Sequence, residues 1–70
     1  MIELNNTLIN INRVNYIEKK ISDADGYTYK TTYILIFHFG EAGGILKLKT
    51  YDKNEYDKWL EVIANETKNR

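Results

Sequence analysis

Cysteine and proline are both absent from this 70-residue sequence, and histidine occurs once. Without cysteine the chain forms no disulfide and offers no thiolate to a metal ion or to covalent catalysis. A single histidine does not build a zinc site without several carboxylates beside it. We therefore expect no metal site and no cofactor. The lack of cysteine also fits a reducing compartment, so we expect a cytoplasmic protein.

Long apolar runs are missing as well. No stretch approaches the roughly 20 apolar residues that a membrane-spanning helix needs. The first residues, Met1 to Asn6, contain neither the basic segment nor the apolar segment of a signal peptide. We expect a protein that does not enter the membrane.

The sequence also has no excess of charge of either sign, because 10 basic residues balance 10 acidic residues. Proteins that bind duplex DNA are usually basic, and inhibitors that imitate DNA are usually strongly acidic. Duplex DNA is therefore not an expected partner. A neutral total still allows charge to be segregated between faces of the molecule.

The length of the chain predicts one domain, residues 1–70. A domain of this size buries only about 60% of the surface that its unfolded chain exposes, so its stability margin is small. Small domains gain stability from disulfides, metal ions or association. Because the first two routes need residues that this chain lacks, we expect a homo-oligomer.

The longest segment rich in β-branched and aromatic residues is 27–39, between turn-forming clusters at 22–26 and 40–44, and we predict that it is the central strand. Side chains alternate between the two faces of a strand. One face is aromatic and apolar, and we assign it to the core: Tyr27, Tyr29, Thr31, Tyr33, Leu35, Phe37 and Phe39. The other face is polar at its start and apolar near its end: Thr28, Lys30, Thr32, Ile34, Ile36 and His38.

Shorter apolar patterns predict strands at 1–4, 7–12, 14–21 and 45–50, and a helix at 53–66. Asp52 is a suitable N-cap, Glu55 completes a capping box, and Tyr51 with Tyr56 fits a hydrophobic staple. The helix has an apolar stripe formed by Tyr56, Trp59, Leu60, Ile63 and Ala64. The expected fold is α+β, an antiparallel meander of four to five strands with one C-terminal amphipathic helix on one face.

One helix covers only one face of such a sheet, so the second face of the central strand needs another cover. We predict that Ile34, Ile36 and His38 lie in an interface, by sheet packing or edge pairing between subunits. His38 is also the only side chain that ordinarily titrates near neutral pH. Because Ser22 is the only serine and cysteine is absent, no catalytic triad is predicted, and we do not expect an enzyme.

A candidate ligand site combines tyrosines and lysines. Tyr27, Tyr29 and Lys30 lie near the start of the central strand, and Lys47 and Lys49 share the polar face of the last strand. Aromatic rings stack on bases and ammonium groups contact phosphates, so this pattern is typical of nucleotide or single-strand binding. The alternative is a core of cross-strand aromatic pairs, which the sequence leaves open.

Several short segments carry a resemblance to known small proteins. They are an N-terminal apolar start, an asparagine turn, a strand, a glycine before two leucines, and a helix start: Met1–Leu4, Asn5–Asn6, Val14–Glu18, Gly44 with Leu46 and Leu48, and Asn54–Tyr56. In this layout the chain resembles small flagellar or swarming-motility proteins of bacteria, and it is similar to short orphan proteins of Firmicutes and their phages. The resemblance carries over no functional residue.

These features predict a small non-enzymatic binding protein that acts stoichiometrically. The most concrete version is a phage-type counter-defence protein that sequesters a nucleotide signal or blocks a host protein. The alternatives are a bacterial regulatory adaptor that docks on a protein partner and a single-stranded nucleic-acid binder. The last of these requires Lys30, Lys47 and Lys49 on one exposed face.

Overall fold

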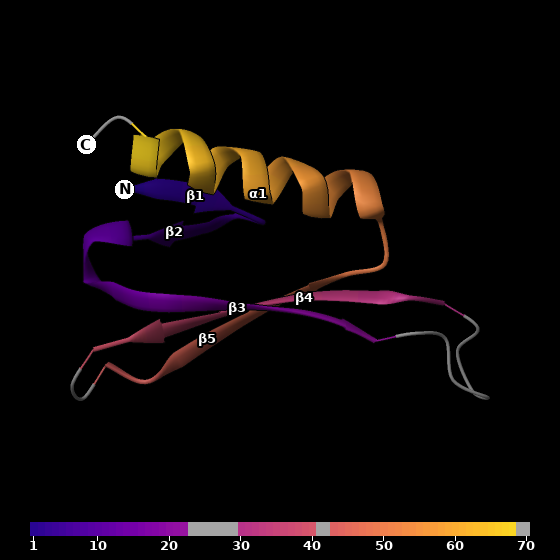
Figure 1. Ribbon diagram of the computed structural model, residues 1–70, viewed down its shortest axis with the longest axis horizontal. Coiled ribbons are helices and arrows are strands. Elements are labelled where there is room, and N and C mark those ends of the chain that lie inside the picture. The colour runs from indigo at the N-terminus through magenta and orange to yellow at the C-terminus, as the bar shows by residue number, and fades with distance from the viewer. Residues whose placement is uncertain (23–29, 41–42, 69–70) are drawn as a thin grey trace.

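The computed structural model describes residues 1–22, 30–40 and 43–68, and it shows an α+β fold with one C-terminal helix packed on antiparallel strands (Figure 1). The predicted fold class is confirmed. In chain order the elements are β1 Ile2–Leu4, β2 Thr7–Ile9, the 3-10 helix η1 Ile11–Arg13, β3 Val14–Ser22, β4 Thr32–Phe39, β5 Ile45–Thr50 and α1 Lys53–Lys68.

The strands form two sheets rather than one continuous meander. β3, β4 and β5 make a three-stranded antiparallel sheet with β4 in the centre, and β1 and β2 make a separate hairpin. The hairpin turns at Asn5 and Asn6, whose φ angles are 52° and 60°. Asparagine tolerates this left-handed region better than most residues, which explains why the predicted asparagine turn forms.

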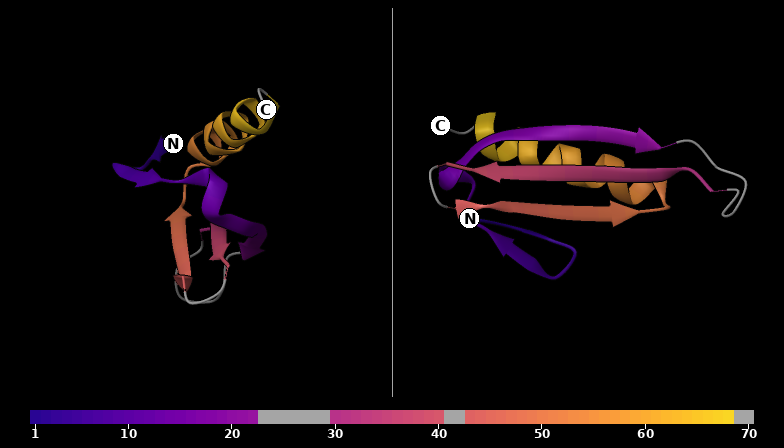
Figure 2. Two further views of the ribbon diagram at one scale, coloured as in Figure 1. Left: turned by 90° about the vertical axis from the view of Figure 1, so that its left-hand side faces the viewer. Right: turned by 90° about the horizontal axis from the view of Figure 1, so that it is seen from below.

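The hairpin and the helix cover the same face of the three-stranded sheet. Seen from below, the sheet lies in front, α1 lies behind it, and the hairpin lies beside β5 (Figure 2, right). The buried core draws on all of these layers: Ile2, Leu4, Ile9, Ile11, Leu35, Phe37, Leu48, Tyr56 and Trp59. The N-terminal isoleucines Ile2, Ile9 and Ile11 therefore join the core.

The helix begins where its capping signals predict. The Thr50 hydroxyl oxygen accepts a hydrogen bond from the Asp52 amide at 3.0 Å, and Asp52 Oδ1 accepts one from the Asn54 amide at 2.9 Å. Tyr56 and Trp59 are buried as expected. Tyr51, the predicted partner of Tyr56 in the hydrophobic staple, is not buried but 61% exposed. The Tyr56 ring pairs instead with Tyr33, with 5.1 Å between the ring centroids.

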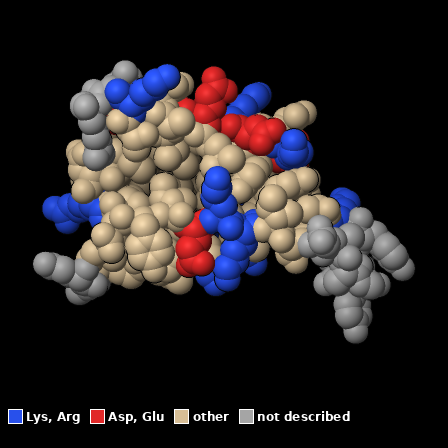
Figure 3. Space-filling view, viewed as in Figure 1, with Lys and Arg blue, Asp and Glu red and all other residues tan. Residues whose placement is uncertain are grey.

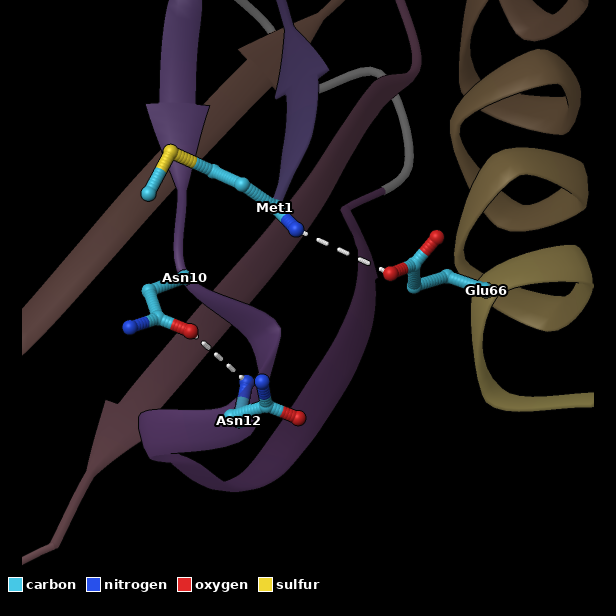
Figure 4. A network of polar contacts seen from close by, with 4 residues as sticks. All are labelled: Met1, Asn10, Asn12 and Glu66. Carbon is cyan, nitrogen blue, oxygen red and sulfur yellow. Dashed lines mark hydrogen bonds and ion pairs between the residues drawn. The ribbon is translucent and has the colours of Figure 1, made fainter. Parts of the chain in front are cut away.

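The helix also extends beyond its predicted end at residue 66, to Lys68. In this last part Glu66 Oε1 lies 3.7 Å from the amino nitrogen of Met1, as Figure 4 shows. Ala64, the last member of the predicted stripe, is exposed. The contact between the helix and the core therefore ends with Ile63, which packs against the core cluster.

The central strand is shorter than predicted because its neighbours end. β4 begins at Thr32, which pairs with Ser22 at the end of β3, and the last pair toward β5 is Tyr33 with Thr50. Lys30 and Thr31 precede the strand. Tyr27 and Tyr29, which the prediction placed in the same strand, lie outside the described residues.

The second strand is also shorter than predicted, ending at Ile9 instead of residue 12. The side chain of Asn10 accepts a hydrogen bond from the Asn12 amide at 3.2 Å and caps the 3-10 helix (Figure 4). Asparagine competes with strand pairing through such local bonds, so the chain turns here. The turn directs buried Ile11 into the core and leads into β3.

A substitution of Trp59 tests the packing of α1 on the sheet. We expect Trp59→Ala to lower the free energy of unfolding by about 3–5 kcal/mol, because it removes a large buried ring. This approaches the whole stability of a domain of this size, about 4–10 kcal/mol. Thermal melting followed by circular dichroism measures the loss. Val62→Ala, on the exposed side of the same helix, is the matched control, and equal melting temperatures for the two variants would contradict the packing.

Tyr56 gives a second test, through pH. Burial, and next the nearby Asp57 carboxylate, raise the pKa of Tyr56 above its usual 10.0. The folded state therefore holds the phenol proton more tightly than the unfolded state does. This stability is complete below about pH 10 and is lost as the pH rises through the folded pKa. Urea unfolding at pH 8 and at pH 11 measures this loss, and the free energy of unfolding should fall less between the two pH values for Tyr56→Phe than for the parent protein. An equal fall in both proteins would contradict the linkage.

Candidate functional site

The face of the β3–β4–β5 sheet that points away from α1 and the hairpin is the candidate site, and we call it the open face. Strand register arranges its side chains in rows, with one residue from each strand. From one end to the other, the rows are Tyr16, His38 and Ile45, then Glu18, Ile36 and Lys47, then Lys20, Ile34 and Lys49. The view from below in Figure 2 looks onto this face.

His38 is held at one end of the open face by two neighbours from β3. Its Nε2 hydrogen-bonds with Glu18 Oε1 at 2.5 Å. The Tyr16 ring stacks on the imidazole, with 4.1 Å between centroids and 10° between the planes. Both contacts hold the imidazole in place on this face. Tyr16 remains 54% exposed and presents an aromatic ring to solvent.

The two isoleucines in the middle of the open face are less exposed in the single chain than the sequence predicts. Ile36 is only 5% exposed although neither the helix nor the hairpin covers it. Its neighbours across the strands are Glu18 and Lys47, and long side chains of this kind cover apolar surface with their aliphatic stems. Ile34 is half-buried. A partner subunit is thus not needed to cover Ile36, although an interface at Ile34, Ile36 and His38 stays a prediction.

Lysines flank this apolar centre. Lys47 and Lys49, predicted as ligand residues, are exposed on β5, and Lys20 is exposed on β3. The Lys30 ammonium lies 5.5 Å from the centroid of the Tyr51 ring, just beyond the end of β5. Four of the basic side chains therefore lie on or beside the open face, and only Glu18 opposes them there among the described residues.

Sequence patterns missed the aromatic members of this face. Tyr16 and Tyr51 are exposed near its two ends, whereas the predicted aromatic members, Tyr27 and Tyr29, lie outside the described residues. Tyr16 was assigned only to an apolar strand pattern. Its stacking partner His38 lies 22 positions away in the sequence, so only the strand register reveals the pair. No local motif signals it.

Charge is segregated between the two sides of the molecule. The helix carries both signs, with Glu55, Asp57, Glu61 and Glu66 beside Lys53, Lys58 and Lys68. Figure 3, which looks onto the side of the molecule, shows this mixture over the helix and basic side chains beside one acidic group over the sheet below. Among the described residues, the open face is thus more basic than the zero net charge suggests. Such a surface attracts anionic ligands more strongly than the net charge suggests.

The part of the chain that the structure describes contains no cluster of metal-ligating side chains. Within it, no three His, Asp or Glu side chains gather as potential metal ligands. No helix among residues 1–22, 30–40 and 43–68 is long and apolar enough to cross a membrane. All buried side-chain nitrogen and oxygen atoms of these ranges have hydrogen-bond partners. The open face therefore offers rings, ammonium groups and apolar contact.

No known family matches this chain. Neither family models, nor characterised protein sequences, nor solved structures gave a match. The resemblance to motility proteins and to phage proteins therefore stays a prediction. Function has to be inferred from the residues themselves.

The open face yields a test with an internal control. We expect Ile36→Ala to lower the free energy of unfolding by about 2 kcal/mol, the low end for a buried isoleucine, because Ile36 is buried outside the main core cluster. Ile45→Ala removes the same atoms from a residue that is 57% exposed on the same face, and should cost much less. Urea titration measures both. Equal losses would show that Ile36 is not covered in the single chain.

Proposed function

We propose that this protein is a small non-enzymatic binding protein that acts stoichiometrically and takes a phosphate-bearing ligand of nucleotide type on its open face. One observation carries the proposal: the register brings Lys20, Lys47 and Lys49 to one face with an exposed tyrosine near each end. Ammonium groups bind phosphates, and exposed rings stack on bases.

The dimensions of the open face support this ligand class. Adjacent rows are two residues apart, about 6.8 Å along the strands. Three such steps, about 20 Å, separate the row of Tyr16 from the level of Tyr51 at the far end. This length suits a short segment of single strand or a compact dinucleotide. Larger single-strand sites on β-sheet faces take about 4–16 nucleotides.

A stoichiometric role fits the chemistry of the face. His38, the single histidine, is hydrogen-bonded to Glu18 and stacked against Tyr16. Among the described residues, no serine or threonine hydroxyl hydrogen-bonds with its imidazole. We therefore propose binding without turnover. A protein that works in this way must be made in an amount comparable to its ligand.

Two ligand sources share this chemistry. One is a free nucleotide signal, which a phage-type counter-defence protein would sequester. The other is a single strand of RNA or DNA. Fluorescence polarisation separates them with labelled cyclic dinucleotides in one series and oligothymidylates of 2 to 12 nucleotides in the other. Tight binding of a dinucleotide without a gain from length supports sequestration, and affinity that rises with length supports strand binding. Binding in neither series would overturn the proposal.

The lysines provide the decisive variants. We expect Lys47→Glu with Lys49→Glu to weaken binding of the better probe at least tenfold, because both ammonium groups face the ligand. For an oligonucleotide, removing two phosphate contacts should also reduce the slope of log K against log salt by about 1.4.

The matched control is Lys53→Glu with Lys58→Glu on the helix, where both lysines are exposed. It changes the net charge by the same amount but leaves the open face intact. The control should keep nearly all of its affinity. An equal loss in both double variants would mean that the ligand responds to the overall charge and not to this face.

A further inference from the structure

The outer edge of β3 is a second surface without a partner. Among the described strands β3 pairs only with β4, so the other edge of its nine residues, Val14–Ser22, is not paired. Along such an edge, backbone N–H and C=O groups point outward and can pair with another extended chain. β3 is the longest of the strands described, so it offers the longest template.

A hollow opens beside the first half of this edge. It has a volume of about 230 Å³ and lies between the start of β3 and the last turn of α1. Its lining is mostly apolar: Ile11, Val14, Asn15, Tyr16, Ile17 and Thr67. An apolar cavity of about 150 Å³ accepts benzene, so this hollow has room for a leucine or phenylalanine side chain. The β-bulge between Val14 and Tyr16 lies at the same place.

The charges along the edge are basic. Lys19 and Lys20 are exposed in its second half, and Arg13 is exposed just before its start. The one acidic residue of β3, Glu18, is already bonded to His38. An incoming strand therefore meets ammonium and guanidinium groups, and acidic side chains complement them.

In the two registers centred on the charged middle of β3, a second copy of this chain complements the edge less well than an acidic chain does. Antiparallel pairing of two β3 strands about Lys19 would match Glu18 with Lys20 and Ile17 with Ile21. It would also place Lys19 directly opposite the Lys19 of the second copy. Shifting the centre to Glu18 would instead oppose two glutamates. Like charges directly opposite each other destabilise strand pairing, and a lysine in the middle of an edge strand discourages self-association.

We propose that the β3 edge binds an extended acidic segment of a partner protein as an added strand, with one apolar side chain of that segment seated in the hollow. The backbone pairing supplies affinity, and the hollow with its basic neighbours supplies specificity. This site shares Tyr16 and Lys20 with the open face, but the backbone edge of β3, Lys19 and Thr67 lie outside that face, and the protein ligand goes beyond the proposed nucleotide ligand. Because Lys19 lies on the helix side of the sheet, opposite Leu35 in register, it belongs to this edge and not to the open face.

The probe is a fluorescein-labelled synthetic hexapeptide that alternates aspartate with valine and carries one phenylalanine. We expect saturable binding by fluorescence polarisation, together with slower amide hydrogen exchange in β3 and unchanged exchange in the β1–β2 hairpin. A peptide with lysine in place of each aspartate should bind at least tenfold more weakly.

Two matched pairs of variants locate the site. Thr67→Trp fills the hollow and should weaken peptide binding at least tenfold, whereas Asn65→Trp, exposed on the same helix, should not. Lys19→Glu should weaken it similarly, with Lys58→Glu as the control. Thr67→Trp should leave the affinity for the nucleotide probe unchanged, so that a failure of this site and a failure of the open face are distinguishable.

Three results would overturn the proposal. They are no saturable peptide binding at millimolar peptide, exchange protection outside β3, and equal losses in a variant and its control. Sedimentation of the free protein adds a fourth test. A dimer whose β3 protection disappears on dilution would mean that a second copy occupies the edge instead.

Discussion

The alternation of side chains along β4 is the constraint on which the rest of the structure depends. Leu35 and Phe37 point to one side and are fully buried, so the helix and the N-terminal hairpin must both lie on that side. The residues between them necessarily point to the other side. A one-residue slip in register would exchange the two sets and leave the core without its centre. The same constraint that builds the core therefore also fixes the composition of the open face.

Sequence patterns predicted the elements whose signals are local. The last strand was predicted with its observed bounds, Ile45–Thr50, because its leucines and lysines alternate without interruption. The start of the helix followed from Asp52, whose side chain caps it as expected. Strand ends were predicted less well, since they depend on where a neighbour stops, as Thr32 does opposite Ser22. Asn10 ended β2 early through a bond to the next turn.

The candidate site was predictable only in part. Lys47 and Lys49 were identified because their alternation within one strand places them on a common face. The contacts of His38 with Glu18 and Tyr16 were not, because strand pairing brings them together across 20 or more positions of sequence. The burial of Ile36 was missed for a related reason. Whether long side chains on adjacent strands cover a residue depends on register, which a single sequence does not specify.

The position of Trp59 has a practical consequence for measurements of unfolding and of ligand binding. It is the only tryptophan in the chain, and it is buried where the helix meets the sheet. Its indole fluorescence therefore reports on the docking of one element, with emission that shifts to longer wavelength when the ring meets water. The open face and the β3 edge lie away from this ring. If a ligand binds without changing the emission, whereas unfolding shifts it, then the ligand occupies a rigid scaffold and does not rearrange the core.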